Sequence, residues 1–145
     1  MIDIIVITHG KFAEGLKDSV NMIVGEYSNL TTVSFNPGES IEALEDKIKK
    51  VLNDEKKEKA LIFVDVFAAS PFNASMKAYN SLENSKEIGV ITGVNLPMVM
   101  EALLSSESDD LDGLVKSLIE GGRESIQDAL ASLNSQIDDS TEDDY

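Results

Sequence analysis

The chain contains a single histidine, His9, which is the residue with the clearest potential for chemistry. It follows a short apolar, β-branched run and precedes Gly10 and a helix-like pattern. Near neutral pH an imidazole is a nucleophile, a base or a metal ligand. In open α/β sheets, ligands bind beyond the carboxyl ends of the strands. His9 stands at such a place, although a lone histidine after a strand is more often a packing or capping residue.

Two other apolar runs also end in polar residues, at Asp65 and Asn95. A carboxylate that accepts one ring N–H of a histidine leaves the other ring nitrogen with a free lone pair. Ser70 before Pro71 predicts a helix start, with Ser70 as the N-cap. Helix N-termini attract phosphoryl groups through free N–H groups and the helix dipole. Each residue alone is more often a turn or cap, but together they favour phosphorylation of His9.

Four apolar runs must position these residues, and helical patterns separate them. The runs cover residues 2–7, 30–35, 60–64 and 88–92. Near-continuous apolar strands between helices indicate an α/β single-domain open sheet, mainly parallel, with helices on both faces. Right-handed crossovers are compatible with strand order 2-1-3-4, in which the first and third strands are about 4.8 Å apart. This order brings His9 beside Asp65.

Apolar residues at three- and four-residue spacing predict the helices. We expect them over residues 11–24, 40–52, 70–82, 95–105 and 111–133, with the last one broken near Gly121 and Gly122. Residues 135–145 are acidic and too polar to pack, so we expect a disordered tail there. The chain is thus divided into one folded domain, residues 1–134, and this tail.

Composition narrows the classes of function. The net charge of −15 disfavours nucleic acid and anionic lipid as partners. Without cysteine, and with one histidine, a transition-metal site is not expected, although carboxylates alone could hold Mg²⁺ or Ca²⁺. We expect neither a metal nor a cofactor. No apolar run approaches the ~20 residues of a membrane helix, and the N-terminus lacks a signal-peptide pattern, so we expect a cytoplasmic protein.

Four motifs resemble those of the IIA component of the mannose-type sugar phosphotransferase system, the mannose–fructose–sorbose family. They occur in the family's order and at similar spacing, and they cover about residues 1–122. The motifs are Thr8-His9-Gly10 with Ala13 and Gly15-Leu16, Asn36-Pro37-Gly38-Glu39, Asp65 with Ser70-Pro71-Phe72-Asn73, and Gly93-Val94-Asn95-Leu96-Pro97-Met98.

The resemblance implies that the protein is a phosphotransferase that carries phosphohistidine. His9 would accept a phosphoryl group from the carrier protein HPr and pass it to a IIB component. IIB would phosphorylate a sugar that enters through the membrane components IIC and IID, so the protein would reach the membrane only through that permease complex. Asp65 would orient His9, and Gly10 and Ser70 would contact the phosphoryl group.

The resemblance also carries implications for assembly and docking. The family forms homodimers, and its sheet gains an edge strand from the partner subunit. Three phenylalanines lie near the expected site in the sequence, and we expect them to form an apolar docking patch for HPr, with core packing as the alternative for each. They are Phe12, Phe67 and Phe72.

The chain departs from the family pattern in two loop features and at its C-terminal segment. Ala68 and Ala69 stand where the family usually has two glycines, and alanine fits an ordinary loop but not a strained one. Val66 stands where a polar residue often follows the aspartate. An acidic segment follows the domain where related proteins have a linker to a fused IIB domain, so we expect IIB to be a separate chain.

Three other functions remain open at this stage. The first is a IIA-like protein that donates phosphate to dihydroxyacetone kinase. The second is a regulatory protein that is phosphorylated at His9 but passes nothing on. The third is a hydrolase-like enzyme with His9 as base, which is less favoured because no serine nucleophile is evident beside it. The sequence does not reveal the sugar.

Overall fold

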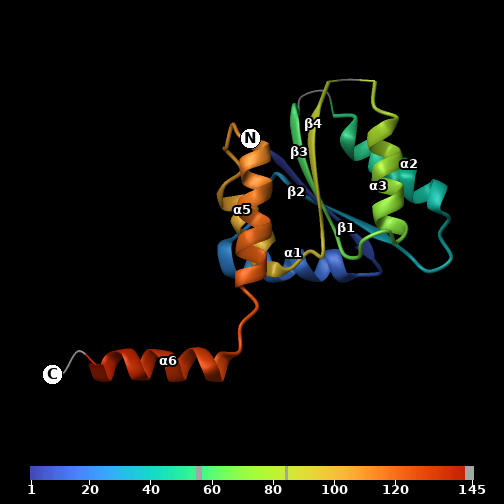
Figure 1. Cartoon of the computed structure of the whole chain (residues 1–145). Helices are drawn as coiled ribbons and strands as arrows, with labels where there is room; N and C mark the ends of the chain where they lie inside the picture. The colour runs from blue at the N-terminus through green and yellow to red at the C-terminus, as the bar shows by residue number, and fades with distance from the viewer. Residues whose placement is uncertain (55–56, 84, 143–145) are drawn as a thin grey trace.

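The computed structural model describes residues 1–54, 57–83 and 85–142 and shows a four-stranded sheet between two layers of helices (Figure 1). The strands pair in the order β2-β1-β3-β4, and all three pairings are parallel. This confirms the predicted fold class and strand order. The strands are β1 Asp3–His9, β2 Leu30–Phe35, β3 Lys59–Val64 and β4 Glu87–Thr92.

Alternating side chains of the central strand feed two apolar cores, one on each face of the sheet. Ile4 and Val6 belong to the core under α1, α4 and α5, and Ile5 and Ile7 belong to the core under α2 and α3. Both faces are therefore covered, as the uninterrupted apolar runs predict. The helices are α1 Phe12–Val24, α2 Ile41–Leu52, α3 Ser70–Asn80, α4 Leu96–Leu104, α5 Leu111–Glu124 and α6 Ala129–Glu142.

The start of α3 differs from the prediction. Ala69, not Ser70, is the N-cap, and no side chain caps this helix. Ala69 has an extended backbone, and its carbonyl already accepts the first helical bond from the Asn73 N–H. Ser70 is therefore the first helical residue. By contrast, a side chain accepts a backbone N–H at the start of α2, α4 and α5.

The predicted break near Gly121 and Gly122 lies a few residues further along the chain, because α5 continues through both glycines to Glu124 and α6 begins at Ala129. Gly122 packs against Met98 so closely that a Cβ atom there would lie 2.3 Å from the Met98 Cε atom. This glycine therefore allows α4 and α5 to approach each other, rather than ending the helix.

The C-terminal segment differs from the predicted disordered tail. Helix α6 crosses the predicted boundary at residue 134 and extends to Glu142, and residues 143–145 lie outside the described part. Asp128 accepts hydrogen bonds from the N–H groups of Leu130 and Ala131, which is the usual geometry of a helix cap. Figure 1 shows α6 extending away from the sheet and its covering helices. Within the described residues, no helix is long and apolar enough to cross a membrane.

Candidate functional site

His9 and Asp65 meet at the carboxyl edge of the sheet, as the strand order predicts. His9 is the last residue of β1, and Asp65 follows the neighbouring strand β3. The His9 Nδ1 atom lies 2.8 Å from Asp65 Oδ2, and the His9 backbone N–H donates to the same oxygen at 2.9 Å. The other carboxylate oxygen accepts the Val66 N–H at 3.0 Å. The side chain of Asp65 is 11% exposed, whereas that of His9 is 46% exposed.

This geometry selects one tautomer of the imidazole. Burial of the Asp65 carboxyl would by itself raise its pKa, but hydrogen bonds from the His9 backbone and ring, the His9 charge and the Val66 N–H outweigh burial. The pKa of Asp65 therefore lies below its usual value, and the group is an ionised acceptor at neutral pH. Nδ1 must then carry the ring hydrogen, and Nε2 of the neutral ring keeps a free lone pair.

Phe35 contacts the His9 ring from the other neighbouring strand. The two residues are partners in the register of β1 and β2, and their ring centroids are 5.8 Å apart with planes at 66°. Sequence analysis did not single out Phe35. The available signal was its position at the end of the second apolar run, which the strand order places beside the first.

The two expected phosphate contacts differ in their availability. The Gly10 N–H already donates to the Phe35 carbonyl at 2.8 Å, so this group has a partner in the protein. The N–H groups of Ser70 and Phe72 at the start of α3 have no hydrogen-bond partner in the described structure. Pro71 has no N–H group. The N-terminus of α3 thus keeps free donors, which is typical of helices that bind anions.

The loop that joins Asp65 to α3 contains the two alanines noted in the sequence. Ala68 has φ +62, in the left-handed region, whereas Ala69 has φ −83. The Asn73 side-chain amide donates to the Ala68 carbonyl at 3.0 Å and holds this conformation. One alanine therefore occupies a strained position and the other an ordinary one.

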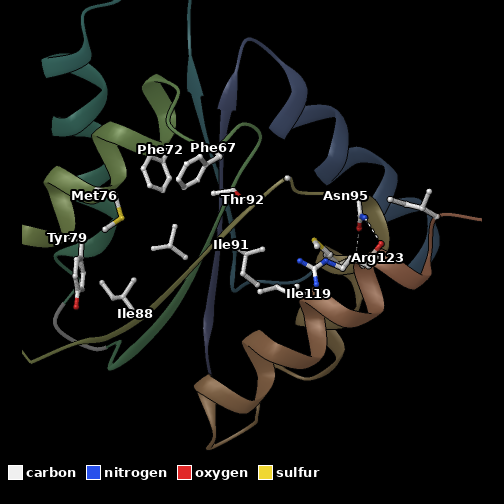
Figure 2. A pocket seen from close by; sticks show the side chains of 15 residues that line it. Phe67, Phe72, Met76, Tyr79, Ile88, Ile91, Thr92, Asn95, Ile119 and Arg123 are labelled. Carbon is white, nitrogen blue, oxygen red and sulfur yellow. Dashed lines mark hydrogen bonds between the residues drawn. The ribbon is translucent and has the colours of Figure 1, made fainter.

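The three phenylalanines are in different surroundings. Phe12, on α1, is 48% exposed, and Phe67 is 71% exposed. Phe72 is half-buried and packs against the core under α2 and α3. Phe67 and Phe72 contact each other with centroids 5.0 Å apart, and Figure 2 shows their rings side by side. The structure thus pairs these two and leaves Phe12 separate.

Beside β4 lies an apolar groove of about 630 Å³, between α3 and α5 (Figure 2). His9 and Asp65 do not line it. Asn95 does, but its side chain caps α4 by accepting the Met98 N–H and donates to the Gly122 carbonyl, so its bonds are structural. The aromatic side chains of the groove come from α3 and the loop before it, its aliphatic side chains come from β4 and α5, and its charge comes from Arg123. Its lining includes Phe67, Phe72, Tyr79, Ile88, Val90 and Ile119.

Comparison with known proteins identifies the family. The family model described as "PTS system fructose IIA component" matches residues 3–119. The fructose-specific EIIA component of Bacillus subtilis (strain 168) is 36% identical over 128 residues, which are 88% of this chain and 86% of that protein. The mannose-specific EIIAB component of Escherichia coli (strain K12) is 37% identical over 128 residues. The match covers 87% of this chain but only 39% of that longer protein.

Solved structures agree with the sequence comparisons. The phosphotransferase system component EIIA of Streptococcus agalactiae superposes with a TM-score of 0.77 at 30% identity, over 88% of this chain and 97% of that chain. The mannose/sorbose-specific IIA subunit of Enterococcus faecalis gives a TM-score of 0.77 at 26% identity, over 88% and 93% of the two chains. The chain therefore belongs to the mannose-family IIA components of the phosphotransferase system.

Proposed function

We propose that this protein is a phosphohistidine carrier that accepts a phosphoryl group on His9 Nε2 from phospho-HPr and passes it to a IIB component for sugar uptake. The observation that carries the proposal is the 2.8 Å contact between His9 Nδ1 and Asp65 Oδ2, with the ring half-exposed. This contact holds the tautomer with a free Nε2 lone pair, and the exposure gives a protein donor access to that atom.

The transfer step needs no proton movement. The Nε2 lone pair attacks phosphorus, so that a new N–P bond forms while the N–P bond of the donor histidine breaks. The donor ring carries a hydrogen on its other nitrogen and is therefore itself a phosphorylated imidazolium, so it keeps the electron pair of the broken bond and leaves as a neutral imidazole. His9, which retains its Nδ1 hydrogen, becomes a phosphorylated imidazolium. Asp65 stabilises this positive charge through the hydrogen bond already present.

The start of α3 supplies the other half of the proposed site. His9 points to the same face of the sheet as Ile5 and Ile7, and this is the face covered by α2 and α3. The free N–H groups of Ser70 and Phe72, with the positive end of the helix dipole, would share the charge of the phosphoryl oxygens. The Ser70 hydroxyl would add one donor. The Gly10 N–H already donates to the Phe35 carbonyl, so it is not expected to contact the phosphoryl group.

Intact-mass spectrometry tests the proposal after the protein is mixed with phosphoenolpyruvate, enzyme I and HPr at neutral-to-alkaline pH. We expect one acid-labile phosphoryl group on the wild type and none on His9→Gln. Addition of the IIB component should then remove the label. Label that stays with every IIB would indicate a regulatory protein, and label that moves only to dihydroxyacetone kinase would indicate the other donor role. No added mass with an active donor chain would refute the carrier function.

Phe12 and Phe67 are the residues proposed to dock HPr, because both expose apolar rings near the carboxyl edge of the sheet. Phe12→Ala should raise the HPr concentration needed for half-maximal transfer about tenfold and leave the helical circular dichroism signal unchanged. Met22→Ala is the matched control, since Met22 is 88% exposed at the far end of the same helix. An equal effect of both variants would contradict docking at Phe12.

We also propose a homodimer in which a partner subunit adds a strand to β4. β4 is an edge strand, and the N–H of Glu87, at its start, donates to the Glu58 carbonyl on the β3 side, so by alternation along the strand the N–H of Val90 faces outward. The apolar groove runs along this edge. Val90→Pro removes that outward N–H without removing a hydrogen bond to β3, so light scattering should show a monomer. A dimer that persists in this variant would place the interface elsewhere.

A further inference from the structure

We infer that Phe35 is a positioning residue for phosphoryl transfer, whose ring limits rotation of the His9 imidazole and so fixes the direction of Nε2. The inference rests on the proposed carrier function. It concerns a residue that neither the sequence motifs nor the hydrogen bonds of the site single out.

Phe35 is itself firmly held. It is the last residue of β2 and the register partner of His9, and its carbonyl accepts the Gly10 N–H at 2.8 Å. Its ring is half-buried and packs against the core that contains Ile7 and Val33. Because partners in a parallel sheet point to the same face, the Phe35 and His9 side chains lie side by side on that face. The Phe35 ring is therefore a fixed surface against which the imidazole can rest.

The imidazole needs such a surface. Among the described residues the ring makes one hydrogen bond, from Nδ1 to Asp65 Oδ2, which restrains a single ring atom; coupled rotation about χ1 and χ2 can still tilt the ring while this contact is kept. The His9 side chain is 46% exposed, so close packing on all sides does not restrain it. Phe35 contacts the ring from the strand opposite to the one that carries Asp65, with centroids 5.8 Å apart and planes at 66°. Tilted ring contacts at this separation are a preferred arrangement of aromatic pairs.

Orientation of Nε2 matters because the donor nitrogen, phosphorus and Nε2 must be in line during transfer. Reactions between positioned groups depend steeply on alignment, and small displacements cost large factors in rate. A ring held by Asp65 alone would keep its tautomer for part of the time but would spread Nε2 over several directions. Loss of the Phe35 ring should therefore slow the transfer step itself and leave docking of HPr unchanged.

A purely structural role for Phe35 predicts a different result. Leucine at this position keeps most of the apolar volume in the core but removes the flat ring beside His9. If Phe35 served only the core, Phe35→Leu would lower stability without any change at the imidazole. Phe63→Leu provides the matched control, because Phe63 is fully buried on the central strand β3, in the core on the other face of the sheet.

The experiment measures two quantities on Phe35→Leu, Phe35→Tyr and Phe63→Leu. The first is the tautomer population of His9, from ¹⁵N chemical shifts of the imidazole in the absence of any donor. The second is the single-turnover rate of phosphorylation by phospho-HPr, as a function of HPr concentration. All proteins are compared at a temperature at which circular dichroism shows them fully folded.

For Phe35→Leu we expect a smaller fraction of the Nδ1–H tautomer and a maximal rate about tenfold lower, with an unchanged half-saturating HPr concentration. Phe35→Tyr keeps the ring and should restore both values, and Phe63→Leu should match the wild type in both. Wild-type tautomer and rate in Phe35→Leu would overturn the inference. If the wild type itself is not phosphorylated, the carrier function fails, and the tautomer measurement still decides whether Phe35 orients His9.

Discussion

The two edges of the sheet each hold a nearly buried aspartate with one close partner, yet only one edge forms a candidate site. At the carboxyl edge, Asp65 is 11% exposed and lies 2.8 Å from the His9 ring. At the amino edge, Asp3 is 8% exposed and lies 2.6 Å from Lys57 Nζ. Both carboxylates are therefore nearly buried, and each has a basic side chain in contact. The partner differs, because lysine stays protonated whereas an imidazole has a neutral form with a lone pair.

The backbone differs between the edges as well. Every loop that leaves a strand at the carboxyl edge contains one residue of positive φ: Gly10, Gly38, Ala68 or Gly93. Among the described residues, the amino edge has one, Gly25 after α1. Irregular loops at the carboxyl edge bring backbone donors and side chains to the site. At the amino edge, Asp3 is instead paired directly with Lys57. We therefore expect Asp65 to act in phosphoryl transfer and Asp3 to contribute to stability.

The largest expected effect is on transfer in Asp65→Asn. Asparagine can still accept the Nδ1 hydrogen, but it carries no charge to stabilise the imidazolium that forms during transfer. We expect a transfer rate roughly 100-fold lower, on the order of 2.7 kcal/mol in the barrier, in a protein that remains folded. Rapid-quench phosphorylation by phospho-HPr measures this rate. Asp3→Asn is the control and should transfer at the wild-type rate; an equal loss in both variants would remove the distinction between the edges.

The next largest effect is on stability in Lys57→Met. This change leaves the Asp3 carboxylate buried without its cation, which costs about 2 kcal/mol of the free energy of unfolding after allowance for the partly exposed Lys57. Urea denaturation measures the loss, and phosphorylation kinetics should not change. The double variant with Asp3→Asn should recover most of the stability, because no buried charge remains. A destabilisation of the double variant equal to that of Lys57→Met would show that the ion pair is not the cause.

The sequence predicted the juxtaposition of His9 and Asp65 because the apolar pattern indicated a parallel sheet, and right-handed crossovers are compatible with the order 2-1-3-4, which brings the ends of the first and third strands together. Ser70 was misplaced by one position because the cap depends on the backbone of Ala69, and a serine before a proline does not determine it. Phe35 was missed because its role depends on register between strands, which no single run reveals. The last helix was predicted only to residue 133, whereas α6 continues to Glu142, because the acidic, polar composition of residues 135–145 was interpreted as a disordered tail.

A smaller effect concerns the pH dependence of the free energy of unfolding at the carboxyl edge. The pKa of Asp65 is lower in the folded protein than its ordinary value, so its contribution to stability is present above that ordinary value and disappears as the pH falls through the folded value. The unfolding free energy of the wild type should therefore fall more steeply below about pH 4 than that of Asp65→Asn. Urea denaturation at a series of pH values measures both slopes. Glu39 and Glu45 also have lowered pKa values, but both variants share them, so they cancel. Parallel slopes would contradict the pairing of Asp65 with His9 in solution.

The smallest expected effect concerns the loop after Asp65. Ala68 has φ +62, which costs an L-residue about 1–2 kcal/mol relative to glycine. Glycine in turn gives the unfolded chain more freedom, worth about 0.4–1 kcal/mol, so Ala68→Gly should stabilise the protein by about 0.5 kcal/mol. Ala69→Gly is the matched control: Ala69 is unstrained at φ −83, so only the entropic cost remains and stability should fall. Thermal denaturation of the two variants should thus give shifts of opposite sign. Shifts of the same sign would mean that the loop relaxes in solution, and the contrast between a strained carboxyl edge and a relaxed amino edge would then rest on the glycines alone.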